Sequence, residues 1–459
     1  METEDRVLAL LKLHSRHTTS FQILEPGYQY WFDGDDACVA YADTGRAWVA
    51  AGAPVAPERR LAAVTRRFIK AAEASGRKAR FFGVDEAFSS TTGLHRTHIG
   101  EEPYWDPSAW DRVLAGSKSL REQLRRARAK GVALRRVTAS EISDPQNATR
   151  MGIDALIARW LASHALSEMK FMVLVHPFSH PEERRYVVAE RDDVVIGFAA
   201  AVPIYGLEGW FVEDVIRDPD APNGTAESLV DAMMRRLAAE GCRTATLGLA
   251  PLAGEVNTAL RLTRNYTAAL YNFGGVRAFK KKLRPARWEP VYLAYPHDHL
   301  GLWAIRDVLS AFAPGGLLRF GLNTLIHERS LATFVLGALL IPWTVAIALA
   351  PEGIWFPSRA VQMAWVGFDV MLIVLLGALV QRWRPWLASF LFSLTTLDAG
   401  LTLLQFVTWN LTRTQGMGSW LIVLAGLLGP ILASAFFFAT RRVAMRSKLP
   451  LARLHPDST

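Results

Sequence analysis

Residues 209–250 read GWFVEDVIRDPDAPNGTAESLVDAMMRRLAAEGCRTATLGLA, which divides into a strand, a proline-bearing loop, an amphipathic helix, a Gly-basic turn and a second strand. In the helical part, apolar residues recur at Leu229, Met233 and Leu237, the spacing of one helix face. Gly241 stands where a glycine commonly ends a helix. The segment therefore predicts a strand–helix–strand unit.

The same pattern occurs in residues 47–85, AWVAAGAPVAPERRLAAVTRRFIKAAEASGRKARFFGVD. Leu61, Val64 and Phe68 have the helical spacing, and Gly76 takes the place of the helix-ending glycine. Each copy comes with a predicted hairpin, whose turn is DTGR in the first and RDD in the second. We therefore predict a duplicated domain, with a basic helix, SKSLREQLRRARAKG, between the copies at 117–131.

The last third of the chain has the composition of a membrane domain. Four apolar segments of spanning length occur there, at 331–350, 360–380, 386–409 and 419–440. Each has about 20 residues, which at a rise of about 1.5 Å per residue crosses a hydrocarbon core of about 30 Å. We predict an all-α domain of four membrane-spanning helices.

Basic residues orient these spans. The loop at 382–385 and the segment RRVAMRSK after the fourth span carry most of the positive charge, whereas the other two loops carry only Arg359 and Arg413. Positive loops face the cytoplasm. Residues 1–20 contain no uninterrupted apolar core of signal-peptide length, so we expect the catalytic region to be cytoplasmic as well.

Two acids, Asp369 and Asp398, interrupt the second and third spans. An acid at membrane depth usually faces the bundle interior or a polar cavity. One interpretation is a headgroup or proton site between these spans. The other is a structural pair of acids, hydrogen-bonded to Thr395, Thr396, Thr402 or Gln405.

The segment before the spans, GLWAIRDVLSAFAPGGLLRFGLNTLIHERS (301–330), is half apolar, with basic residues along it and a Pro-Gly-Gly break at 314–316. It predicts two short amphipathic helices on the cytoplasmic membrane face. A linker packed on the catalytic region is the alternative.

The formal net charge of +9 favours contact with anions, either nucleic acid or anionic lipid headgroups. The two cysteines, Cys38 and Cys242, show neither metal-ligand spacing nor a disulfide framework. We therefore expect two buried free thiols and no metal site.

A hairpin, a strand, a helix and another strand form the core of the GNAT acyltransferase fold, so two copies predict a tandem GNAT-like domain of α/β (α+β) class. The second copy also contains a series of short motifs in a fixed order: DVIR (214–217), DAPNG (220–224), LGLAPL (247–252), YNF (271–273), FKKK (279–282), Pro285 and WEPVYL (288–293). In this order and spacing they resemble the C-terminal synthase domain of the bacterial phosphatidylglycerol lysyltransferases, the multiple peptide resistance factor family. The first copy matches more loosely, through Gly52–Pro54 and GEE (100–102).

These observations divide the chain into five parts. They are a first GNAT-like domain with the basic linker helix (1–135), a second GNAT-like domain with the family motifs (136–298), an interfacial amphipathic linker (299–330), a four-span transmembrane domain (331–441) and a cytoplasmic basic tail (442–459). The best-known family members have a long membrane domain before the synthase, whereas here a short one follows it. The resemblance therefore gives no support for lipid flipping.

The resemblance implies an aminoacyltransferase in the bacterial inner (cell) membrane, with several spans and a cytoplasmic catalytic region. It would move an amino acid from aminoacyl-tRNA to the headgroup hydroxyl of phosphatidylglycerol or a related anionic phospholipid. Such a change lowers the negative charge of the membrane and could raise resistance to cationic antimicrobial peptides. An aminoacyl ester is already activated, so no cofactor is expected. The sequence indicates no oligomeric state.

Asp214 and Arg217, three residues apart at the end of a strand, are the predicted catalytic pair. The acid can bind an amino-acid ammonium, and the arginine can hold a phosphate or order the acid; a structural ion pair is the alternative. Asn223 and Gly224 precede a helix, where backbone N–H groups can meet an oxyanion, or they form a plain turn. Glu102 is a further candidate for binding substrate, and candidates for the general base are Asp214, Glu213 and Glu102.

Two basic clusters suit a polyanionic donor or a lipid phosphate. The first lies on the 117–131 helix and consists of Arg121, Arg125, Arg126, Arg128 and Lys130. The second consists of Lys280, Lys281, Lys282 and Arg284. For the first cluster a solvated basic helix face is the alternative.

Two other functions remain open from the residues. The first is a GNAT-type lipid acyltransferase that uses an acyl thioester. The loops APVAPERR and DPDAPNGTAES speak against it, because neither resembles the glycine-rich turn that holds the pyrophosphate of coenzyme A. The second is a non-catalytic membrane binding or transport protein, for which Asp369 and Asp398 are the positive support.

Overall fold

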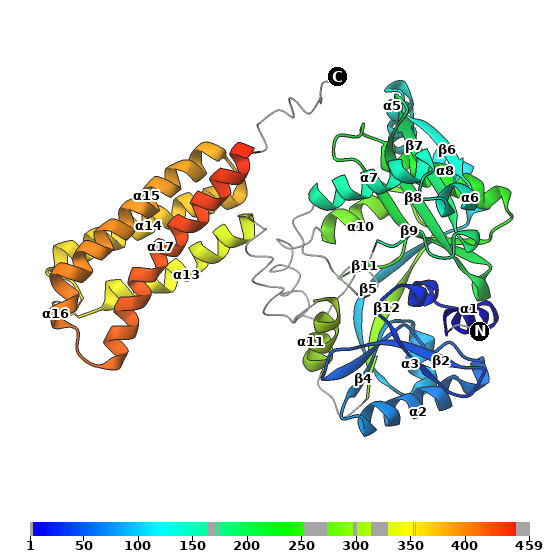
Figure 1. Ribbon diagram of the computed structural model, residues 1–459, viewed down its shortest axis with the longest axis horizontal. Helices are drawn as coiled ribbons and strands as arrows, with labels where there is room; N and C mark the ends of the chain where they lie inside the picture. The colour runs from blue at the N-terminus through cyan, green and yellow to red at the C-terminus, as the bar shows by residue number, and fades with distance from the viewer. Residues whose placement is uncertain are drawn as a thin grey trace, which may run out of the picture. The chain divides into compact units, whose positions relative to one another are not determined.

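The computed structural model describes residues 3–163, 171, 175–251, 273–296, 301–313, 329–351, 353 and 355–446. The chain forms two compact units, Met1–Thr324 and Leu325–Thr459. The first is a mixed α/β unit and the second is all-helical (Figure 1).

The described strands of the first unit form one sheet (Figure 1). Its order is β1-β2-β3-β4-β12-β5-β10-β9-β8-β7-β6, with β11 paired to β5 beside this path. The strands are β1 (Gln29–Phe32), β2 (Cys38–Asp43), β3 (Ala47–Ala51), β4 (Lys78–Val84), β5 (His95–Trp105), β6 (Ala133–Val137), β7 (Arg185–Arg191), β8 (Val194–Ile204), β9 (Gly209–Arg217), β10 (Thr244–Thr246), β11 (Ala250–Pro251) and β12 (Arg287–Tyr295).

The predicted duplication is confirmed. In the first copy β3, helix α2 (Leu61–Ala74) and β4 form a unit whose strands are parallel, and β9, α8 (Thr225–Ala239) and β10 repeat it in the second. One detail differs. DTGR joins β2 to β3, and the corresponding turn of the second copy is 205–208, between β8 and β9. RDD, which was predicted to be that turn, instead joins β7 to β8, one hairpin earlier in the chain.

The two copies share their sheet. Strand β12, the last of the second copy, lies between β4 and β5 of the first, and β5 pairs in turn with β10 of the second. Residue 135 therefore separates two repeats within one sheet. That it is also a domain boundary remains a proposal. The physical reason is that β5 supplies backbone hydrogen bonds to strands of the second copy on both of its edges.

Helices cover both faces of the sheet. Phe68 of α2 packs with Phe81 on one face of the first copy, and α1 (Thr3–His14) and the 3₁₀ helix η1 (Thr18–Leu24) pack on the other. In the second copy the core under α8 and the core under α7 (Ala148–Ser163) lie on opposite faces. Five further α-helices of this unit precede α11 among the described residues. They are α3 (Glu86–Thr92), α4 (Trp110–Ala115), α5 (Lys118–Ala129), α6 (Ala139–Ser143) and α10 (Phe273–Lys282).

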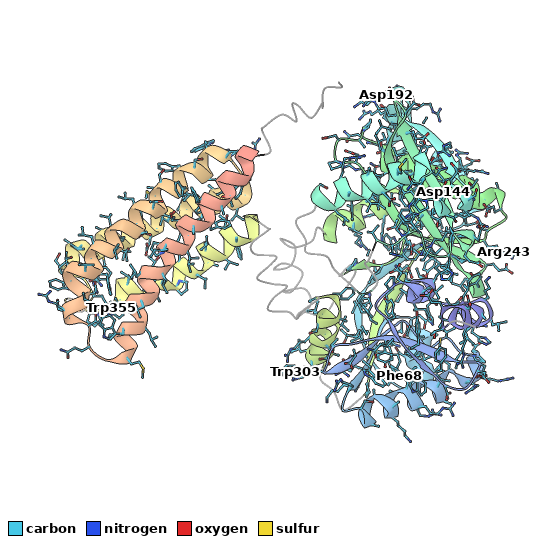
Figure 2. All side chains as sticks on the ribbon, in the orientation of Figure 1. Phe68, Asp144, Asp192, Arg243, Trp303 and Trp355 are labelled. Atoms are coloured by element: carbon cyan, nitrogen blue, oxygen red, sulfur yellow. The ribbon has the colours of Figure 1, made fainter. Side chains whose placement is uncertain are left out.

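Helix α11 (Gly301–Phe312) is the first half of the predicted interfacial linker. It packs on the soluble unit through Ala304 and Val308, and Asp307 accepts a hydrogen bond from Nε of the buried Arg80 of β4, with which it forms an ion pair. This matches the alternative of a packed linker. Its other face leaves Leu302 and Trp303 66% and 55% exposed, and Trp303 points away from the sheet (Figure 2). The second predicted helix falls within 314–328, outside the described residues.

Among its described residues the second unit has four helices that are long and apolar enough, by length and composition, to cross a membrane, as predicted. They are α13 (Arg329–Leu349), α14 (Arg359–Gln381), α15 (Pro385–Gln405) and α17 (Met417–Arg446). A π-helical turn, η6 (Phe406–Asn410), and the short α16 (Leu411–Arg413) extend α15 toward α17. The predicted tail at 442–459 lies mostly outside the described residues.

The Arg80–Asp307 pair generates a stability prediction. Asp307→Asn should lower the thermal unfolding midpoint of the soluble unit, because the fully buried Arg80 guanidinium loses its carboxylate. Breaking a buried pair on one side costs about 3–5 kcal/mol. The measurement is circular dichroism of the full chain in detergent. Arg306→Gln, on the same helix beside Trp303, is the control and should change the midpoint little; equal midpoints for both variants would contradict the assignment.

Candidate functional site at the junction of the two copies

The segment that includes η1 lies between the two copies. All of its residues from Phe21 to Leu24 are buried, and it contacts β3 of the first copy and β8 of the second. The Gly206 backbone N–H, between β8 and β9, donates to the Ser15 carbonyl at 2.8 Å. A Cβ on Gly206 would stand 2.4 Å from that oxygen, so only glycine permits this approach. The segment thus holds groups from both copies in fixed places.

An irregularity in β9 aims two acids at one site. Ala200 of β8 pairs with Asp214, and the adjacent Ala201 pairs with Val212, so Glu213 is an extra residue in the ladder. A β-bulge of this kind bends the strand and redirects side chains, and bulges are common beside active sites. Here it allows the consecutive residues Glu213 and Asp214 to interact with the same cation.

That cation is Arg184, which precedes β7. Its side chain is fully buried, and it makes an ion pair with Glu213, whose side chain is 5% exposed. Arg184 also donates to the Ser179 carbonyl at 2.8 Å. Glu25, directly after η1 and 4% exposed, is the third acid of the group. One guanidinium therefore faces three carboxyl groups, which we call the acid cluster: Glu25, Glu213 and Asp214.

Burial raises the pKa of each acid in the cluster, and repulsion from neighbouring acids adds to this for Glu25 and Asp214. Burial, followed by the charges of Glu213 and Asp214, raises the pKa of Glu25 to about 9. Burial, followed by the charge of Glu213, raises the pKa of Asp214 to about 8. Burial also raises the pKa of Glu213, against the opposing effect of Arg184. At neutral pH the cluster therefore retains protons that a bound cation could replace.

Two oxygens of the acid cluster lack donors. Glu25 Oε2 and Glu213 Oε2 are buried and accept no hydrogen bond in the described structure. Buried acceptors are normally paired, and unpaired ones are costly. An ammonium group, with three N–H donors, has the charge and the hydrogen-bonding capacity to satisfy them.

A second buried polar network lies at the other end of η1. Tyr104 Oη and Thr18 Oγ1 donate to Glu102 Oε2 at 2.8 and 3.0 Å. Lys280 Nζ of α10 donates to the carbonyls of Gly248 and Leu249 at 2.8 and 2.9 Å. Burial raises the pKa of Glu102 and lowers the pKa of Lys280 to about 8. We call these four side chains the lysine network: Thr18, Glu102, Tyr104 and Lys280.

The two groups are linked through η1, because Thr18 begins it and Glu25 directly follows it. At the 3₁₀ rise of about 2.0 Å per residue, seven residues place them roughly 14 Å apart. This spacing leaves room for an extended substrate to reach from one group toward the other.

The predicted catalytic pair is only half present at this site. Asp214 belongs to the acid cluster, whereas Arg217 is exposed at the end of β9, opposite Gly197, with no ion pair among the described residues. Arg184 stands where Arg217 was expected. Sequence reasoning missed both Arg184 and Glu25. The available signal was Glu25 at the end of the apolar run FQIL, an acid with no polar neighbour to keep it at the surface.

The turn before α8 is closed by packing. Gly224 has φ +99°, and a Cβ there would stand 2.2 Å from the carbonyl oxygen of Gln123 in α5. The backbone of α5 thus covers the start of α8, while Asn223 is exposed. This favours the plain-turn interpretation of Asn223 and Gly224 over an oxyanion site at the helix N-terminus.

The basic residues divide into engaged and free groups. On α5, Arg125 and Arg126 pair with Glu122, and Arg121 donates to the Leu114 carbonyl. Lys282 pairs with Glu227, and Lys280 is buried in the lysine network. The exposed side chains without an ion pair among the described residues include Arg128, Lys130 and Lys281. These three are the better placed for contact with phosphates.

The family model described as "Phosphatidylglycerol lysyltransferase, C-terminal" matches residues 8–295, more than half of the chain. The chain belongs to this family. A family relative, the phosphatidylglycerol lysyltransferase of Bacillus subtilis, is 26% identical over 286 residues, which are 58% of this chain and 32% of the relative. The chain thus matches about a third of the length of that protein.

Two solved structures share the fold of this family member. One is the C-terminal domain of an Agrobacterium fabrum protein named as a lysylphosphatidylglycerol synthetase, at 24% identity and a TM-score of 0.57. The other is L-PGS from Bacillus licheniformis, at 19% identity and the same TM-score. Each match covers 67% of this chain and 95% of the solved chain. The tandem GNAT-like fold and the family resemblance predicted from the sequence are confirmed.

The acid cluster predicts a pH dependence of stability. The pKa of Glu25 is about 9 in the folded protein, against about 4.5 in an unfolded chain, so the folded state loses stability as pH rises between these values. One pKa unit corresponds to about 1.4 kcal/mol. Glu25→Gln resembles the protonated acid and should raise the unfolding midpoint at pH 9 more than at pH 5.

The measurement is a thermal unfolding series of the full chain in detergent from pH 5 to 9. Glu73→Gln, an exposed carboxyl on α2, is the matched control and should show no pH-dependent difference from the parent protein. A Glu25→Gln effect that is the same at every pH would refute the buried-acid description.

Proposed function

We propose that this chain transfers an aminoacyl group from aminoacyl-tRNA to the headgroup hydroxyl of phosphatidylglycerol or a related anionic lipid. Membership of the phosphatidylglycerol lysyltransferase family supports lipid aminoacylation as the activity. The observation that carries the site assignment is the acid cluster, which has more buried carboxyl groups than cations and two oxygens without donors.

The reaction is an acyl transfer between two oxygens. The lipid hydroxyl oxygen attacks the ester carbonyl carbon, the bond from that carbon to the tRNA ribose oxygen breaks, and the proton of the hydroxyl ends on the ribose oxygen. No oxidant, metal or cofactor enters this balance. The protein has to hold the amino acid, help the proton move and stabilise the oxyanion that forms on the carbonyl.

The two buried groups suit separate parts of this task. The acid cluster would hold the side-chain ammonium of an amino acid such as lysine, because the α-ammonium is only one carbon away from the carbonyl. Arg184 would keep Glu213 in place. The lysine network would stand near the carbonyl, where the Lys280 ammonium, with its lowered pKa of about 8, has one N–H left to donate beyond its bonds to the Gly248 and Leu249 carbonyls. Glu102 orients Tyr104 and is a candidate for accepting the hydroxyl proton.

The surface suits the two proposed substrates. Arg128, Lys130 and Lys281 are exposed cations that could meet tRNA phosphates or the lipid phosphate. The four spans would hold the enzyme in the bacterial inner membrane, and the basic loop at 382–385 supports a cytoplasmic position for the catalytic unit. The acceptor lipid and the aminoacyl-tRNA donor would then both be available on that side.

The acyl-thioester alternative is less well supported. A GNAT enzyme that uses coenzyme A binds pyrophosphate at the start of the helix that corresponds to α8. Here Gly224 packs against the carbonyl of Gln123, and the first turn of α8 carries the buried acid Glu227. Both features disfavour a pyrophosphate.

Lipid analysis tests the activity directly. Cells that express the full chain should contain a new ninhydrin-positive lipid, heavier than phosphatidylglycerol by one amino-acid residue, that is missing from empty-vector cells. Mass spectrometry of the extract gives the mass of the added residue and so names the amino acid. An unchanged lipid profile in an expressing host with charged tRNA would overturn the proposal.

Substitutions test the site. Asp214→Asn should lower kcat/KM for lipid aminoacylation by roughly 10- to 100-fold, the loss expected for a hydrogen bond to a charged group. Arg217→Gln should cost much less, because Arg217 stands outside the acid cluster, and Glu73→Gln should behave as the parent protein. The readout is transfer of radiolabelled amino acid from tRNA to lipid. If Arg217→Gln proves as damaging as Asp214→Asn, the sequence-based pair is the correct one and the role of Arg184 is wrong.

A further inference from the structure

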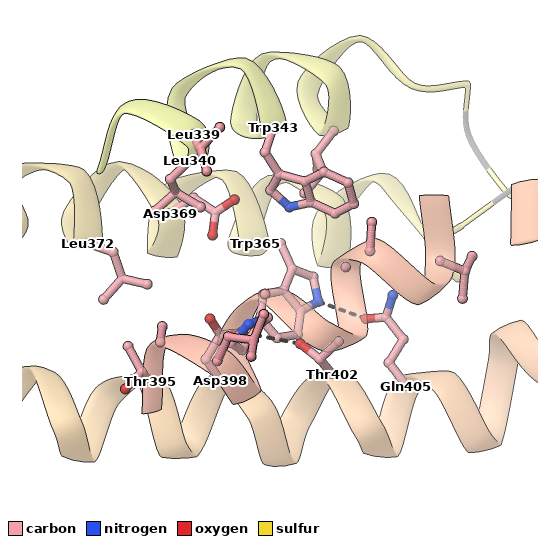
Figure 3. Close-up of a pocket in the computed structure, with 18 of the residues that line it drawn as sticks. Leu339, Leu340, Trp343, Trp365, Asp369, Leu372, Thr395, Asp398, Thr402 and Gln405 are labelled. Atoms are coloured by element: carbon pink, nitrogen blue, oxygen red, sulfur yellow. Dashed lines mark hydrogen bonds between the residues drawn. The ribbon is translucent and has the colours of Figure 1, made fainter. Parts of the chain in front are cut away.

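The membrane unit has a partly open cavity of about 440 Å³ between α13, α14, α15 and α17 (Figure 3). A volume of this size falls in the range of small-molecule sites. Its walls are mainly aliphatic and aromatic, and they include Trp343, Trp365 and Phe437. The cavity belongs wholly to the helical unit, so it is separate from the junction site of the soluble unit.

Two acids project into this cavity. Asp369 of α14 is 4% exposed and Asp398 of α15 is 7% exposed (Figure 3). Each accepts one hydrogen bond from a threonine hydroxyl, Asp369 from Thr344 at 3.3 Å and Asp398 from Thr402 at 3.2 Å. Among the described residues these are their only partners, and no lysine, arginine or histidine lines the cavity.

Asp369 lies deep within its helix, so the absence of a cation among the described lining residues needs an explanation. Asp369 is 10 residues from the start and 12 from the end of α14, which puts it about 15 Å from either end of the span. Buried charges are nearly always paired, and acids at this depth are retained where they bind or move something. The cavity thus has two carboxyl groups and no protein cation to balance them.

One further polar atom in the cavity lining restricts which ligands would suit the cavity. The indole N–H of Trp355, which also lines the cavity, is buried and donates to no acceptor among the described residues. By contrast, the Trp365 N–H donates to Gln405 at 2.7 Å. A ligand that brings both a cationic donor for the acids and a carbonyl acceptor for Trp355 would satisfy the site, and the tryptophan rings can stabilise the cation by cation–π contact.

We propose that this cavity binds the ammonium-bearing aminoacyl headgroup of a lipid, with Asp369 and Asp398 holding the ammonium and Trp355 donating to the ester carbonyl. The apolar walls suit a ligand whose remainder is lipid. The choice of an aminoacyl lipid rests on the proposed function, because that reaction makes such a lipid. The cavity would then be a binding site for the product, distinct from the site where it forms.

Binding of supplied lipid tests this without any transfer reaction. The full chain, purified in a neutral detergent, is incubated with synthetic lysyl-phosphatidylglycerol or with phosphatidylglycerol, and native mass spectrometry measures the lipid retained. We expect the aminoacyl lipid to be retained roughly 10-fold more strongly. Asp369→Asn and Asp398→Asn, singly and together, should remove this preference.

Ser393→Ala, an exposed position on α15 outside the cavity lining, is the matched control and should keep the preference. Equal retention of the two lipids by the parent protein would overturn the proposal, and this arm needs no variant to fold. A preference that survives in the double variant would overturn the role of the two acids.

A competition arm separates a lipid ligand from a soluble one. Lysine methyl ester carries the same ammonium and ester without the lipid, and it should displace the bound lipid only weakly. Displacement as effective as that by unlabelled lysyl-phosphatidylglycerol would overturn the lipid as the source of the ammonium. Retention of lysyl-phosphatidylglycerol by a chain that proves inactive in transfer would leave the cavity assignment standing while the proposed function fails.

Discussion

The backbone ladder between β5 and β12 is the constraint on which the soluble unit depends. It runs from Arg287 opposite Tyr104 to Tyr295 opposite His95, and it places the last strand of one copy inside the sheet of the other. Because β5 also pairs with β10, neither copy can move as a separate domain without breaking this ladder. The rigid junction that results is what can hold buried charged groups from Glu25, Arg184 and β9 in one place.

Each unit has one place where carboxyl groups outnumber the described cations near them. At the junction three carboxyl groups, two of them buried (Glu25 and Glu213), face one guanidinium. In the membrane unit two acids face a cavity with no cation among its described lining residues. By contrast, the buried Arg80 is paired with Asp307, and the partly buried Lys282 is paired with Glu227. A fold that balances its structural charges in this way marks out the unbalanced ones as places where a cation from outside the protein can bind.

Much of the architecture could be predicted from local patterns. Helical spacing, turn glycines and spanning length were sufficient for β3-α2-β4, for β9-α8-β10 and for the four membrane helices. The position of β12 could not be predicted, because the alternation within a strand does not specify its neighbours. The acid cluster was missed for the same reason: Glu25, Arg184 and Asp214 come from segments far apart in the chain, and only the packing of η1 and the bulge in β9 bring them together.

The central place of β12 also sets the order in which the protein can fold during synthesis. The first copy leaves the ribosome early, but its sheet has a vacant position between β4 and β5 until residue 295 has been made. The second copy is complete by then, and the first membrane span begins at Ala332, only 37 residues later in the chain. Closure of the sheet and synthesis of the first apolar helix are therefore neighbouring events. A delay in closure would leave the edges of β4 and β5 unpaired while the apolar helices are being made.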